Sequence, residues 1–175
     1  MTIDTKDMLN SILSSIARID YVKPEDIPNI DLYMDQVTTF MEEQLSSTKR
    51  HEEDKILTKT MINTYAKNHL LPPPVKKKYS REHVLVLIFI YYFKNILSIK
   101  DIEIILRPLK EKYFSNENNP KLSDLYSEIC AMEKARIEPL KAAVKDAYEQ
   151  SCSAFPDIPD GPDREELQIF SFLCS

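Results

Sequence analysis

Apolar residues recur at intervals of three and four along most of the chain, which predicts α-helices. The first such stretch runs from about Thr5 to Ile19. A second helix is expected to begin near Asn29 to Asp31, and a third spans roughly Thr58 to Asn68 and buries Ile62 and Tyr65. The residues expected on the buried face of the second helix are Tyr33, Val37, Phe40 or Met41, and Leu45.

The longest apolar run, Val84 to Phe93, fits either a buried strand or a core helix. We prefer a helix because Ser80 can cap its N-terminus and because the apolar positions continue through Ile96, which is too long for an ordinary strand. Ser98-x-x-Asp101 then resembles a capping box that opens a further helix. The apolar residues of that helix are Ile99, Ile102, Ile105, Leu106 and Leu109.

The C-terminal third begins with a long helical pattern from Leu122 to Tyr148. Pro139 is expected to kink or break this helix near Glu138, because proline lacks an N–H donor and clashes with the preceding turn. A short apolar tail closes the chain. The expected loops are Ser46–Lys55, Ser115–Pro120 and Phe155–Pro162, and the tail is Leu167–Cys174.

Composition supports an all-α fold. The chain has 175 residues, enough for one well-cored domain, and contains one glycine against eleven prolines. Tight β-hairpins draw heavily on glycine, so a many-stranded fold is disfavoured. The apolar run is about half of the ~20 residues that a membrane span needs, and no secretory signal is recognisable. We therefore expect a cytoplasmic protein that does not enter a membrane.

Charge is distributed unevenly. The whole chain carries −5, but residues 1–48 carry −6, residues 49–81 carry +6 and residues 82–175 carry −5. The cationic segment includes the three consecutive lysines Lys76, Lys77 and Lys78. A local basic patch within an acidic protein points to a polyanionic partner.

Enzymatic motifs are missing from the sequence. It has no G-x-S-x-G, no glycine-rich phosphate loop and no H-E-x-x-H, so we expect neither enzymatic activity nor a cofactor. The histidines His51, His69 and His83 share no helical face, and no metal site is expected. The cysteines Cys130, Cys152 and Cys174 are expected to be free, buried thiols.

Several features follow one another in a recognisable order. Leu70 to Pro74 stops a helix, Lys76 to Tyr79 makes a basic turn, and two helices then open at Ser80 and Ser98. This order resembles the winged helix-turn-helix of the MerR family of transcription regulators. The chain also resembles an uncharacterised Gram-positive bacterial family, a domain of unknown function that carries this element, over roughly Ile30 to Leu106.

The MerR resemblance implies a winged helix-turn-helix core with additional N- and C-terminal helices and a wing that is short or reduced to a turn. It divides the chain into an N-terminal helix and linker (1–28), the helix-turn-helix domain (29–114) and a C-terminal helical segment with a tail (115–175). It further implies a homodimer that binds double-stranded DNA, with the helix at about 59–68 in the major groove.

The residues expected to contact DNA lie on that helix and on the basic turn. Helix residues can read base edges, while flexible cations on the turn can contact phosphates. The candidates are Lys59, Asn63, Lys67, Asn68, Lys76, Lys77, Lys78 and Arg81. The chain departs from the family at Asn63, where the family has arginine, in a wing without glycine, and in a longer Ser46–Lys55 connection.

A second interpretation is open. The chain could be a protein–protein interaction or small-ligand-sensing module that keeps the winged-helix scaffold without binding DNA. The Ser123–Ser153 helix fits dimerisation as well as packing against the N-terminal helix. The sequence identifies neither an operator nor a small-molecule effector.

Overall fold

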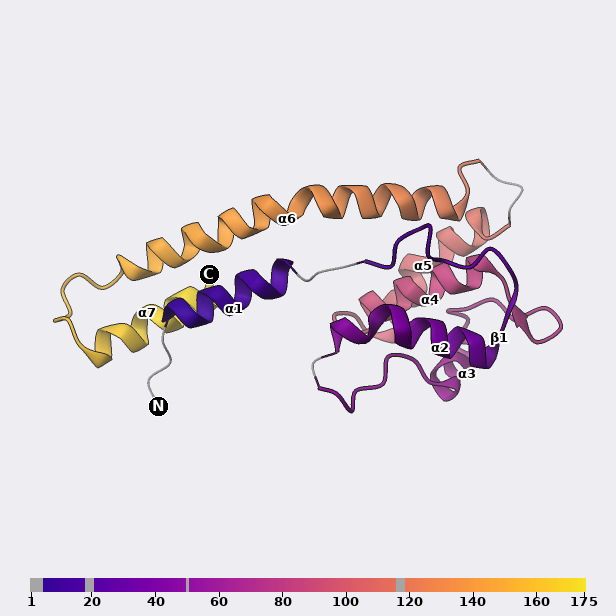
Figure 1. The fold of residues 1–175 in the computed structure, drawn as a ribbon, viewed down its shortest axis with the longest axis horizontal. Coiled ribbons are helices and arrows are strands. Elements are labelled where there is room, and N and C mark those ends of the chain that lie inside the picture. Colours follow the sequence, from indigo (N-terminus) through magenta and orange to yellow (C-terminus); the bar gives the residue numbers. More distant parts are fainter. Residues whose placement is uncertain (1–4, 18–20, 50, 116–118) are drawn as a thin grey trace. The chain divides into compact units, whose positions relative to one another are not determined.

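The computed structural model describes residues 5–17, 21–49, 51–115 and 119–175 (Figure 1). These residues are mostly helical, in agreement with the sequence, and their only strands are two of two residues each. The chain divides into two compact units. Unit 2 comprises Asp20–Ala131, and unit 1 combines Met1–Ile19 with Met132–Ser175.

Unit 2 holds the large hydrophobic core and the predicted basic segment. In chain order its elements are β1 (Leu32–Tyr33), α2 (Met34–Leu45), the 3₁₀ turn η1 (Ser46–Thr48), α3 (Lys59–Lys67), β2 (Lys78–Tyr79), α4 (Arg81–Phe93), α5 (Ile99–Tyr113) and the first part of α6 (Leu122–Cys152).

Helix α4 lies in the centre of this core. Every residue from Glu82 to Tyr91 is buried, so the apolar run is a core helix and not a strand, as predicted. Ser80 is its N-cap residue, and its backbone N–H donates to His83 Nδ1 at 3.0 Å. The predicted Ser98 cap is also confirmed, because its hydroxyl oxygen accepts from the Asp101 N–H at 3.2 Å.

Helix α2 begins later than the pattern predicted. Leu32 and Tyr33 form β1, which pairs antiparallel with β2 in the register Leu32 to Tyr79 and Tyr33 to Lys78. Side chains alternate along a strand, so Leu32 is buried while Tyr33 is 54% exposed. The prediction of a buried Tyr33 was wrong. The other expected residues of this face are buried, namely Val37, Phe40, Met41 and Leu45.

Unit 1 contains α1 (Thr5–Ala17), the remainder of α6 and α7 (Pro162–Cys174). The ring of Tyr148 packs edge-on against Phe172 at 5.5 Å, and its hydroxyl lies 3.3 Å from Thr5 Oγ1. Helix α6 is not broken at Pro139. Pro139 and Ala135, whose carbonyl loses its helical donor, are both exposed, so water can solvate that carbonyl.

Two expectations about the surface can be compared with the structure. Cys152 and Cys174 are exposed, so the prediction of buried thiols was wrong for them. They are the last residues of α6 and α7.

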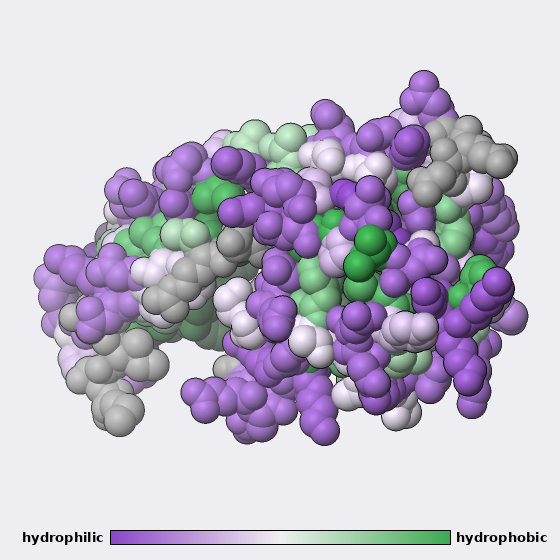
Figure 2. Space-filling model, turned by 45° about the vertical axis from the view of Figure 1, so that its right-hand side comes forward, coloured by the Kyte–Doolittle hydropathy of each residue, from purple (hydrophilic) through white to green (hydrophobic). Residues whose placement is uncertain are grey.

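Within the described ranges, no helix combines the length and the apolar character needed to cross a membrane. Figure 2 shows a face on which hydrophilic residues surround smaller apolar areas.

Candidate nucleic-acid interface

Helix α3 presents one polar face. Its N-cap residue is Thr58, whose hydroxyl oxygen accepts from the Met61 N–H at 3.1 Å. Ile62 and Tyr65 point into the core, as predicted. The opposite face is therefore exposed, and its residues are Lys59, Thr60, Asn63 and Lys67.

The end of α3 is fixed by a Schellman motif. The Leu70 N–H donates to the Tyr65 carbonyl at 2.9 Å, and the His69 N–H donates to the Ala66 carbonyl at 3.2 Å. His69 has a φ of 57°, the left-handed conformation that this motif requires at its C′ position. Leu70 is fully buried, so the chain leaves the helix in a defined direction toward the prolines.

The basic turn is a minimal β-hairpin. Val75 and Lys78 exchange backbone hydrogen bonds of 3.1 and 2.9 Å around Lys76 and Lys77. Both central residues have positive φ, 50° and 64°, as in the type I′ turn of two-residue hairpins. The basic turn therefore forms a hairpin without glycine, with lysines at its two tip positions.

These tip lysines occupy an unfavourable conformation. Type I′ turns favour Asn-Gly, because a Cβ atom is disfavoured at positive φ. Both lysines are exposed, and within the described part of the chain neither makes a hydrogen bond, an ion pair or a ring contact. No side-chain contact among the described residues thus compensates for the backbone strain at Lys76 and Lys77.

Lys78 differs from its two neighbours. Its Nζ lies 5.3 Å from the centroid of the Tyr33 ring, a cation–π distance. The β1–β2 register pairs these two residues directly, which explains the contact. Lys78 is partly buried there, so the free charges of the hairpin are those of its two tip residues.

His83 connects the base of the hairpin to α4. Its Nδ1 accepts the Ser80 N–H, which leaves the proton on Nε2, 3.4 Å from the Pro73 carbonyl oxygen. The ring packs edge-on against Tyr79 at 5.5 Å and Phe114 at 4.8 Å. Burial lowers the pKa of His83, which favours the neutral imidazole that these hydrogen bonds require.

The predicted DNA-contacting residues fall into two groups. Four of them are exposed, and their side chains make no hydrogen bond or ion pair among the residues described, namely Asn63, Lys67, Lys76 and Lys77. The others interact with their own chain. Lys59 forms an ion pair with Asp35, the Asn68 amide donates to the Thr64 carbonyl at 3.0 Å, Arg81 donates to the Pro24 carbonyl at 2.8 Å, and Lys78 lies over Tyr33.

Sequence reasoning missed several residues that shape this surface. Tyr33 was placed in the core, and His83 was considered only as a metal ligand. Lys110 of α5 donates to the His69 carbonyl at the end of α3, a contact that no local pattern signals. Outside the masked positions, no group of three His, Cys, Asp or Glu residues is arranged to hold a metal ion.

Comparison with known proteins identifies a family but not an activity. No curated protein and no solved structure matches the chain. A family model described as "Domain of unknown function (DUF1836)" matches residues 22–129, nearly the same segment as unit 2. The match carries no MerR or helix-turn-helix assignment, so that resemblance stays a prediction. Because more than half of the chain is matched, the protein belongs to the DUF1836 family.

Proposed function

We propose that this protein is a transcriptional regulator that binds double-stranded DNA as a homodimer. Helix α3 enters the major groove, and the Val75–Lys78 hairpin contacts phosphates beside it. The order β1, α2, α3, hairpin, α4 supports this proposal, since it is the order expected of a winged helix-turn-helix.

The observation that carries the proposal is the pairing of an exposed polar helix face with two free lysines on a strained tip. Residues 57–81 contain five lysines and one arginine and no aspartate or glutamate. Duplex DNA requires such local cations, because release of its condensed counterions drives much of the binding. The positive φ of Lys76 and Lys77 destabilises the fold, and a binding partner that contacts these lysines would explain why they occupy these positions.

In this proposal, the exposed residues of α3 contact base edges and those of the hairpin tip contact phosphates. Asn63 can form paired hydrogen bonds with an adenine edge, and Lys67 can donate to guanine acceptors. Lys76 and Lys77 contact the phosphates, which fixes the register of α3 without reading sequence. Lys59, Asn68 and Arg81 instead contact their own chain, at Asp35, the Thr64 carbonyl and the Pro24 carbonyl.

Exposed apolar side chains of unit 1 support the proposal of a homodimer. Leu140 of α6 is 46% exposed, and Phe170 and Leu173 of α7 are 67% and 62% exposed. A second copy of the chain can bury these side chains. A dimer would present two α3 helices to half-sites about one duplex turn apart.

The test is selection of bound duplexes from a random pool, followed by anisotropy titrations of the selected duplex across a salt series. The expected result is a symmetric pair of half-sites and an affinity that falls steeply with salt, each phosphate contact contributing about 0.9 to the slope. Failure to bind any duplex at low salt contradicts the proposal. The scaffold would then serve protein or ligand binding, which charge reversal at Lys76, Lys77 and Lys78 should leave unchanged.

A further inference from the structure

A pocket of about 530 Å³ lies between the segment that follows α2 and the C-terminal end of α4. It belongs entirely to unit 2, and it shares no residue with the exposed face of α3 or with the hairpin. Its lining residues are Thr48, Lys49, Asp54, Lys55, Ile56, Tyr91, Lys94 and Asn95. Three of the eight are lysines and one is acidic.

We propose that this pocket binds a small phosphorylated ligand through its phosphate group. The lining carries three lysines and one aspartate, and because Lys49 is ion-paired with Glu42, Lys55 and Lys94 are the cations available to a phosphate group. The volume lies within the range of about 300–1,000 Å³ that small-molecule sites occupy. Lysine ammonium groups bind phosphate as point charges and need no glycine loop, of which this chain has none.

Lys94 is the inner cation of the pocket. It is the first residue beyond α4, and its Nζ donates to the Ile56 carbonyl at 2.9 Å and lies 4.6 Å from the centroid of the Tyr91 ring. Only one of its three N–H donors is used by that bond, so the ammonium can also donate to a ligand. Burial lowers the pKa of Lys94, and the nearby Asp54 carboxylate opposes this shift.

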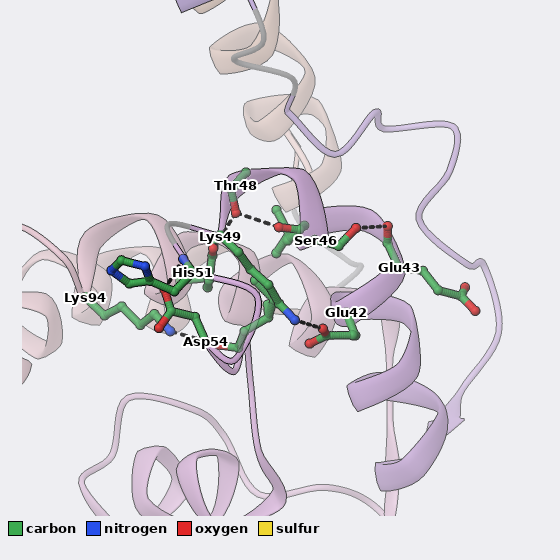
Figure 3. A network of polar contacts seen from close by, with 11 residues as sticks. Glu42, Glu43, Ser46, Thr48, Lys49, His51, Asp54 and Lys94 are labelled. Carbon is green, nitrogen blue, oxygen red and sulfur yellow. Dashed lines mark hydrogen bonds and ion pairs between the residues drawn. The ribbon is translucent and has the colours of Figure 1, made fainter. Parts of the chain in front are cut away.

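Lys49 and Lys55 lie at the outer wall. Lys49 forms an ion pair with Glu42 of α2, whereas Lys55 is exposed and has no ion pair or hydrogen bond among the described residues. Figure 3 shows Lys94 reaching toward the turn that contains His51 and Asp54, and Lys49 directed to Glu42. The Asp54 carboxylate accepts the His51 N–H at 3.0 Å, so it holds this turn.

Neutral polar groups also line the site. The Thr48 hydroxyl is hydrogen-bonded to the Tyr91 hydroxyl and to the Leu45 carbonyl, which orients it at the pocket wall, and Asn95 is exposed beside Lys94. Such groups can bind the hydroxyls of a phosphorylated metabolite. Lys55 and Ile56 shortly precede Thr58, the N-cap of α3, so a ligand bound here contacts the segment that leads into that helix.

The test titrates the full chain with ribose 5-phosphate, with ribose as the neutral control, and follows amide proton–nitrogen NMR correlation spectra. Saturable shifts at millimolar or lower concentration are expected in the residues around Thr48–Ile56 and Tyr91–Asn95, and none with ribose. Inorganic phosphate should compete. Shifts confined to the hairpin lysines, or no saturable shift, overturn the proposal.

Matched variants identify the cations. Lys55→Gln and Lys94→Gln should each weaken binding about tenfold, the effect of one charge-assisted hydrogen bond. Lys100→Gln, an exposed lysine of α5 outside the pocket, should leave it unchanged. Lys55 is exposed and has no ion pair or hydrogen bond of its side chain among the described residues, so the Lys55→Gln variant should fold normally. Unchanged affinity of that variant contradicts the assignment. This readout contains no DNA, so it can fail or succeed independently of the proposed function.

Discussion

Replacing the two tip lysines of the hairpin by Asn-Gly should stabilise the fold while it impairs DNA binding. Lys76 and Lys77 both have positive φ, which costs a non-glycine residue about 1–2 kcal/mol each. Asparagine tolerates this conformation and glycine has no Cβ, although glycine costs about 0.5–1 kcal/mol through its freer unfolded chain. The double variant Lys76→Asn/Lys77→Gly should therefore raise the free energy of unfolding by about 1–3 kcal/mol.

The same change removes two phosphate contacts from each protomer and four from a dimer. The slope of log affinity against log salt should become flatter by about 3.6. Urea denaturation followed by far-UV circular dichroism measures the stability, and fluorescence anisotropy with the selected duplex measures the slope. Lys76→Arg/Lys77→Arg is the control, because it keeps both the charge and the strain and should change neither quantity.

The two halves of this prediction can fail separately. A variant that is no more stable than the wild type would show that the hairpin is not strained by its lysines. A more stable variant with an unchanged salt slope would show that the tip does not contact phosphates. Only the combination of gained stability and lost salt dependence supports the account of the tip as a functional, strained element.

Three further predictions concern α3 and the base of the hairpin. Burial lowers the pKa of His83, so the unfolded chain binds the proton more tightly than the folded chain. The contribution of neutral His83 to the free energy of unfolding is therefore complete above about pH 6.5, the ordinary pKa of histidine. It decreases as the pH falls through the lowered pKa of the folded state. Urea midpoints measured at decreasing pH should show this decline, and His83→Gln should reduce it. Thr58→Ala removes the N-cap of α3 and should cost about 1 kcal/mol in thermal or urea unfolding, whereas Thr58→Ser should cost little; equal losses would refute a capping role. Asn63→Ala should relax base preference at one operator position in a repeated selection and leave the salt slope unchanged, and an unaltered preference would exclude base reading by Asn63.

Locally encoded features of the fold could be predicted from the sequence. The caps at Ser80 and Ser98 depend on residues three positions away, and the burial of Ile62 and Tyr65 follows from helical spacing. Strand β1 could not be recognised in this way. It has two residues, and its partner β2 lies far along the chain, so the exposure of Tyr33 depends on a tertiary pairing.

In the candidate site, too, some features follow from local sequence and others depend on tertiary contacts. Exposure of Asn63 and Lys67 follows from the helical face opposite the core residues of α3. The partners of Lys59 and Arg81 could not be foreseen, because Asp35 and the Pro24 carbonyl come from distant segments. The cationic pocket was also not recognisable, since Lys94 meets the segment after α2 only through the tertiary fold.

The Val75–Lys78 hairpin and the lysine-lined pocket of unit 2 thus have separate proposed roles. The hairpin tip exposes Lys76 and Lys77, which have no side-chain partner among the described residues, as contacts with an extended polyanion require. The pocket lysines line a partly open cavity that suits a small anion. The long Ser46–Lys55 connection, a departure from the MerR pattern, forms part of the wall of that pocket. Together, the two proposals place a site for a phosphorylated metabolite close to the helix that we propose reads DNA.

The most direct measurement of the central claim is the affinity of the wild-type chain for its selected duplex between about 50 and 200 mM salt. A DNA-binding dimer should show binding that weakens linearly on a log–log plot, with at least about 3.6 of the slope contributed by its tip lysines. Absence of binding to any duplex at the low-salt end, or an affinity that does not change with salt, would contradict it.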